Sequence, residues 1–202
     1  MAQHLPDELL LAADRFEAAA KLLLTHDGRL HAESVIASMA RMSGSLLFRS
    51  HGLDRGIEPG TVVLSPQANA EGPKLMDAML LATGRHGQPV SEAEINRAYA
   101  SAAHTGISFK ESHDRLAPSM LKYCETEPLG LRTAALAAAL ATGSLILACA
   151  PVLAPRDGAG VAVYGLIEGS KTAPWPVSGL SRPPIADSLA SAKAAKPWYR
   201  FW

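Results

Sequence analysis

Imidazoles and carboxylates lie closest together in the stretch His26-Asp-Gly-Arg-Leu-His31-Ala-Glu33. Imidazole nitrogens and carboxylate oxygens are ligands that zinc and other divalent ions take from proteins. His26, His31 and Glu33 are therefore the candidate metal ligands. The same residues also fit a solvated turn between two helices, with His26 ending the first helix and Glu33 in the first turn of the second. Spacing alone leaves both interpretations open.

General acid–base catalysis would require such groups to meet histidines from other parts of the chain. The candidate catalytic residues come from separate segments: His31, Glu33, His104 and His113. Only proximity in three dimensions can join them into one site, and residues of these types are also common on exposed helix faces. The sequence has no Gly-x-Ser-x-Gly elbow, and Cys124 and Cys149 lack metal-ligand spacing. No cofactor is expected.

The stretch Gly165-Leu-Ile-Glu-Gly169-Ser-Lys171-Thr172 has glycines, a lysine and a threonine in nearly the order of a phosphate-binding loop. That loop needs four residues between its glycines and then Gly-Lys-Ser/Thr at the start of a helix. Here Ser170 separates Gly169 from Lys171, and the prolines of Ala173-Pro-Trp-Pro176 oppose a following helix. The stretch therefore predicts a turn and not a nucleotide site.

Aromatic residues gather near the C-terminal end of the sequence. The candidate interaction residues are Trp175, Trp198, Tyr199, Phe201 and Trp202. Aromatic side chains are costly to leave in water, and tryptophan and tyrosine are preferred anchors of protein interfaces. We expect this tail to dock on its own domain, on a neighbouring subunit or on another protein. An aromatic and basic chain end also suits a membrane surface, although one short segment binds weakly.

The elements that must position these residues are mainly helical. Apolar periodicity and helix-start signals predict a compact bundle of about five to six helices, at 6–25, 32–49, after Ser65, 91–104, after Ser108 and 130–150. Pro118 is expected to interrupt its segment, and 161–167 to form a small extended element. The predicted organisation is a helical domain over 1–170 and a Pro/Ala-rich tail with an aromatic terminus over 171–202.

Two segments share a pattern of small residues, Ala40-Arg-Met-Ser-Gly-Ser-Leu-Leu47 and Ala139-Leu-Ala-Thr-Gly-Ser-Leu-Ile146. Small residues one turn apart let helix backbones approach closely, so the two helices are expected to pack together, with chance similarity as the alternative. The second segment lies in the uncharged stretch 133–155, which is long enough to span a bilayer. Its alanines and polar residues make insertion marginal, so a buried core helix and a membrane span both remain open.

Composition limits the class of partner. Lysine plus arginine equals aspartate plus glutamate, at 19 each, and no basic run appears, so a nucleic-acid partner is not expected. The start of the chain lacks a basic region followed by a long apolar core, which predicts a cytoplasmic protein. The absent catalytic motifs and the aromatic tail together predict a soluble, non-catalytic protein that acts through protein–protein interaction or homo-oligomerisation. The alternatives are a small-molecule or metal-dependent enzyme that uses histidines and carboxylates from separate helices, and a weakly membrane-associated protein.

Overall fold

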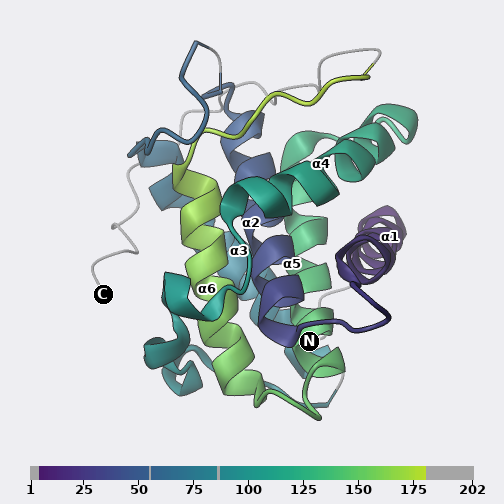
Figure 1. Ribbon diagram of the computed structural model, residues 1–202, viewed down its shortest axis with the longest axis vertical. Coiled ribbons are helices and arrows are strands. Elements are labelled where there is room, and N and C mark those ends of the chain that lie inside the picture. The colour runs from purple at the N-terminus through teal and green to yellow at the C-terminus, as the bar shows by residue number, and fades with distance from the viewer. Residues whose placement is uncertain (1–4, 55, 86, 181–202) are drawn as a thin grey trace.

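The computed structural model describes residues 5–54, 56–85 and 87–180, which fold into a bundle of helices (Figure 1). Within these ranges the six α-helices are α1 (Asp7–Leu24), α2 (Ala32–Ser50), α3 (Pro66–Arg85), α4 (Phe109–Thr126), α5 (Leu131–Ala148) and α6 (Pro155–Lys171). Three single-turn 3₁₀ helices connect α3 to α4, namely η1 (Glu92–Glu94), η2 (Arg97–Tyr99) and η3 (Ala102–His104). The predicted mainly α-helical bundle is confirmed.

Helix α2 runs through the centre of the bundle, and every residue in it except Glu33 is buried. It packs mainly against α6 and α5, and it also contacts α1, α3 and α4. Two of its buried serines, Ser38 and Ser43, form hydrogen bonds with neighbouring helices. The hydroxyls of Ser38 and Ser112 lie 2.9 Å apart, and the Ser43 hydroxyl donates to the carbonyl of Ala135 at 2.8 Å. Such partners offset the cost of removing polar groups from water.

The prediction of an extended element at 161–167 is wrong, because these residues form the middle of α6. Gly165 and Gly169 lie one helical turn apart and face α2. A Cβ added at Gly165 would lie 2.7 Å from the carbonyl oxygen of Ala37, and one added at Gly169 would overlap the backbone of Arg41. The glycines therefore permit close packing of two helices, and this packing outweighs the preference of the neighbouring valines for strands.

Helix α5 occupies most of the uncharged stretch 133–155, but it ends at Ala148, and α6 begins at Pro155. Among the described residues it is the helix whose length and apolar composition would allow it to cross a membrane, and 67% of its 18-residue window is buried within the bundle. α5 packs against α2, as the shared small-residue pattern predicts. Its Gly143, however, faces Met79 and Ala82 of α3, while Gly44 of α2 faces α6.

Two further local expectations differ from the structure. The segment predicted as a helix over 91–104 forms η1, η2 and η3, although Ser91 and Glu94 form a capping box at its start. Pro118 does not interrupt α4, which continues through it to Thr126. A proline inside a helix loses one backbone hydrogen bond, and the packing of Leu116, Ala117 and Met120 in the core maintains the helix here.

The chain after α6 runs alongside the loop that precedes α3. The amide of Gly60 donates to the carbonyl of Ala173 at 2.8 Å, and the amide of Ala173 donates to the carbonyl of Thr61 at 2.9 Å. The amide of Val63 donates to the carbonyl of Lys171 at 2.7 Å. These bonds hold the first residues of the predicted tail against the bundle.

Candidate functional site

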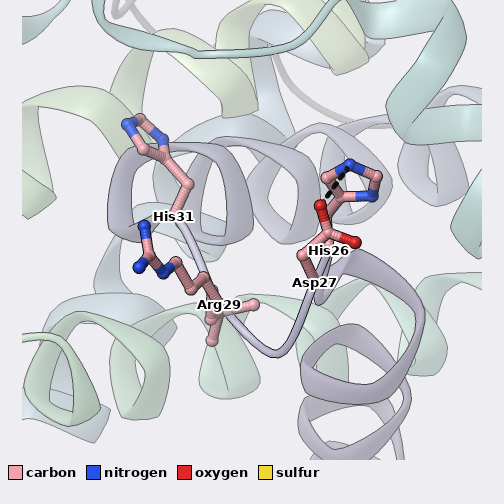
Figure 2. A pocket seen from close by; sticks show the side chains of 5 residues that line it. His26, Asp27, Arg29 and His31 are labelled. Atoms are coloured by element: carbon pink, nitrogen blue, oxygen red, sulfur yellow. Dashed lines mark ion pairs between the residues drawn. The ribbon is translucent and has the colours of Figure 1, made fainter.

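The first candidate site is an open hollow at the turn between α1 and α2 (Figure 2). It has a volume of about 680 Å³ and is lined by His26, Asp27, Arg29, Leu30 and His31. Asp27 and Gly28 have φ angles of 48° and 71°, and the backbones of His26 and Arg29 exchange two hydrogen bonds of 2.9 Å. Positive φ at both central residues is the geometry of a type I′ turn. This turn places the polar side chains around the hollow.

The candidate metal ligands are divided between two separate pairs, of which the first includes Asp27. His26 Nε2 lies 3.4 Å from Asp27 Oδ2, and His31 Nε2 lies 3.5 Å from Glu33 Oε2. The other ring nitrogen of His31 caps α2, because the Ser34 amide donates to Nδ1 at 3.4 Å. In the part of the chain that the structure describes, no three His, Cys, Asp or Glu residues form a group that could hold a metal ion.

The remaining candidate catalytic residues have different surroundings. His104 stacks on Tyr99 with ring centroids 4.4 Å apart. His113 lies on α4, is 1% exposed, and packs edge-on against Phe109 at 6.3 Å. The structure thus brings His31 and Glu33 together. Within the described ranges, no hydrogen bond or ion pair joins either of them to His104 or His113.

A second candidate site, which sequence reasoning missed, surrounds the buried side chain of Arg49 at the end of α2. Its guanidinium donates from Nη1 to Asp54 Oδ2 at 2.9 Å, and from Nη2 to the carbonyl of Trp175 at 2.6 Å. The same Nη2 lies 3.3 Å from His113 Nε2. We call Arg49, Asp54, His113 and Trp175 the Arg49 cluster. Its members lie up to 126 residues apart, so no local pattern could indicate it.

Burial, together with the charge of Arg49, keeps His113 neutral near neutral pH. Burial, and then the positive charge of Arg49, lower the pKa of His113 to about 4. The neutral imidazole can accept a hydrogen bond from the guanidinium through Nε2. Burial lowers the pKa of Arg49, and the carboxylate of Asp54 opposes that shift. The arrangement is that of a buried cation held by a carboxylate, a carbonyl and a neutral imidazole.

Trp175, one of the predicted interaction residues, lies against its own bundle. Its ring centroid is 5.4 Å from that of Phe109 and 6.0 Å from that of His113, and Lys110 Nζ lies 5.9 Å from the ring centroid. The other four predicted interaction residues, Trp198, Tyr199, Phe201 and Trp202, lie outside the described residues.

A buried arginine near the middle of α2 connects three parts of the fold. Arg41 is 2% exposed; its Nε donates to Glu168 of α6 at 2.6 Å, and its Nη1 donates to the carbonyl of Ile107 at 2.6 Å. Nη1 also donates to the hydroxyl of Ser112 on α4 at 3.1 Å. Because these donors are occupied by the protein itself, Arg41 has a structural role in which it holds α6 and α4 against α2.

The outer face of α1 is the third candidate site. α1 buries Leu9, Ala12, Ala13, Phe16, Ala20 and Leu24 against the bundle. On the opposite side lie Leu11, Arg15, Ala18 and Leu22, all exposed, which we call the outer stripe. Leu11 is 54% exposed and Leu22 is 77% exposed. In the sequence, Leu11, Ala18 and Leu22 lie at helical spacing, but the buried face has more apolar residues and dominates the pattern.

Comparison of the chain with protein-family models, with curated proteins and with solved structures found no match.

Proposed function

We propose that this protein acts through protein–protein interaction, including association of its own copies, and not through catalysis. The observation that carries the proposal is the exposure of large apolar side chains on α1 and the turn after it. Leu11, Leu22, Leu23 and Leu30 are all exposed there. Single exposed leucines are ordinary in proteins, whereas several on one helix and its adjoining turn form a surface suited to a partner.

The surroundings of the candidate catalytic residues favour the same proposal. Imidazoles that act as general bases need a free nitrogen within reach of a substrate. His113 faces Arg49 with Nε2 while its ring is enclosed by aromatic side chains. His31 uses Nδ1 to cap α2, and its Nε2 lies beside Glu33 of the same helix turn. Each of these roles stabilises the bundle, so a structural function accounts for these groups.

Light scattering coupled to size-exclusion chromatography tests the proposal on the full chain. We expect the mass to rise above that of one chain as protein concentration increases. A companion experiment measures capture of other proteins by the immobilised wild type and by Leu22→Asp. A chain that stays monomeric at every concentration, and that captures no other protein, would contradict the proposed function.

A further inference from the structure

We propose that α1 pairs in antiparallel orientation with α1 of a second copy of this chain, through the outer stripe. The inference rests on the proposed function and specifies its partner. α1 is suited to this contact because it lies at the periphery of the bundle (Figure 1) and packs on α5, α2 and α4 through its opposite face. An 18-residue helix is about 27 Å long, which allows several turns to meet a partner.

The order of residues along the outer stripe makes it complementary to itself when reversed. Leu11, Arg15, Ala18 and Leu22 are separated by four, three and four residues, the spacing of a helix–helix contact. In an antiparallel pair centred between residues 16 and 17, each Leu11 meets Leu22 of the other copy, and each Arg15 meets Ala18. The long arginine stems therefore lie over small alanines. A parallel pair would instead place Arg15 against Arg15.

Charges beside the outer stripe are also complementary between two antiparallel copies. Asp14 and Lys21 lie seven residues apart, so they occupy one flank of the stripe, and both are exposed. In an antiparallel pair the same flanks face each other, which brings each Asp14 close to Lys21 of the other copy. Asp14 has no ion pair with any described residue, whereas Lys21 Nζ lies 2.6 Å from Glu17 in its own helix. Antiparallel pairing also opposes the two helix dipoles and separates the acidic N-terminal ends.

The first test compares two leucines of equal exposure. Leu22→Asp should weaken the dimer about 100-fold, because each substitution appears twice in a symmetric contact and buries a charge in place of an apolar group. Leu64→Asp is the matched control, since Leu64 is also 77% exposed but lies in the loop before α3. Sedimentation equilibrium measures the dissociation constants, and circular dichroism verifies that both variants remain helical. Equal dissociation constants for the two variants would overturn the inference.

The second test examines the charge pairs. Asp14→Lys places a lysine beside Lys21 of the other copy at both ends of the contact and should weaken the dimer about tenfold. The double variant Asp14→Lys with Lys21→Asp restores opposite charges and should recover most of the loss. Failure of the double variant to recover affinity would contradict the antiparallel arrangement. In that arrangement each Asp14 lies beside Lys21 of the other copy, and no other alignment of two outer stripes has this property.

The third test determines orientation by disulfide formation. Leu11→Cys mixed with Leu22→Cys should form a disulfide between chains under mild oxidation. Leu11→Cys alone should not, because its two copies would lie about 16 Å apart along the helix axis, beyond the reach of a disulfide. The native Cys124 and Cys149 are buried, so the wild type serves as the background control. A disulfide between two copies of Leu11→Cys would overturn the inference.

The outcomes separate this inference from the proposed function. A dimer that survives Leu22→Asp unchanged leaves the proposed function intact and shows that another surface is used. A monomeric chain that retains no partner contradicts both. A monomeric wild type that co-sediments with anionic phospholipid vesicles, and loses that binding in Leu22→Asp, would show that the outer stripe contacts lipid and would overturn the inference.

Discussion

At the scale of single residues, the most informative feature is a histidine that is buried beside a cation. His113 lies next to Arg49, and two charged residues of its own helix, Asp114 and Lys110, also shift its pKa. Protonation of His113 would place two positive charges together inside the protein. Burial and Arg49 both oppose protonation, whereas the carboxylate of Asp114 favours it and is outweighed.

The depressed pKa of His113 predicts how stability depends on pH. The pKa is about 4 in the folded protein against an ordinary value of 6.5, so the unfolded chain binds this proton first as the pH falls. The contribution of neutral His113 to the free energy of unfolding is complete above pH 6.5 and is lost progressively as the pH falls to about 4. We expect a loss of about 3 kcal/mol over this window, measured by urea unfolding.

A substitution separates the effect of His113 on stability from that of the carboxylates, which titrate in the same pH range. His113→Gln keeps an acceptor near Arg49 and removes the titrating group, so its stability should fall less than that of the wild type between pH 6.5 and pH 4. His104→Gln is the matched control, because His104 is only partly buried and stacks on Tyr99. Equal pH dependence in wild type and His113→Gln would show that His113 is not the responsible group.

At the scale of elements, α6 shows why local patterns were insufficient. Its valines favour a strand and its glycines favour a turn, so 161–167 was expected to be extended. In the folded protein the glycines face α2, and the helix gains burial that no short segment can predict. Helices with one clear apolar face or start signal, such as α1 and the first turns of α4, could be predicted because their signals lie within the element itself.

The packing of α6 on α2 predicts opposite effects for two alanine substitutions in one helix. Gly169→Ala would force a methyl group onto the backbone of Arg41, which cannot move without displacing α2. We expect a loss of about 2 kcal/mol, since overpacking outweighs the better helix propensity of alanine. Gly158→Ala meets only flexible side-chain carbons of Ile36 and Ile146, at 3.3 Å and beyond.

Gly158→Ala should therefore leave stability unchanged or raise it by up to about 1 kcal/mol. Thermal and urea unfolding of the two variants provide the comparison. If Gly169→Ala proved as stable as Gly158→Ala, the close approach of α6 to Arg41 would not be a constraint on the fold.

At the scale of the whole molecule, the Arg49 cluster joins regions that are far apart in the sequence. It combines the end of α2, the second turn of α4 and the segment after α6. Periodicity could predict that α2 and α4 are helices, but not that a buried arginine at the end of one would bind the backbone of Trp175. For the same reason the candidate catalytic histidines could be named from their types, while their separate surroundings depend on the tertiary fold.

This long-range contact predicts different consequences for two C-terminal truncations. Ending the chain after Ala173 removes Trp175, which leaves Arg49 without one of its acceptors and exposes Phe109. We expect a loss of about 3 kcal/mol, from one charge-assisted hydrogen bond and part of an aromatic contact. Ending it after Leu180 keeps these contacts and should leave the free energy of unfolding unchanged.

The truncation after Leu180 also distinguishes the two surfaces proposed for association. It removes Trp198, Tyr199, Phe201 and Trp202, which were expected from the sequence to anchor a partner, but it leaves the outer stripe of α1 complete. If α1 forms the dimer contact, the truncated chain should keep the dissociation constant of the full chain in sedimentation equilibrium. A truncated chain that is monomeric while its unfolding midpoint is unchanged would assign association to the C-terminal aromatics instead, because stability and assembly would then depend on different segments.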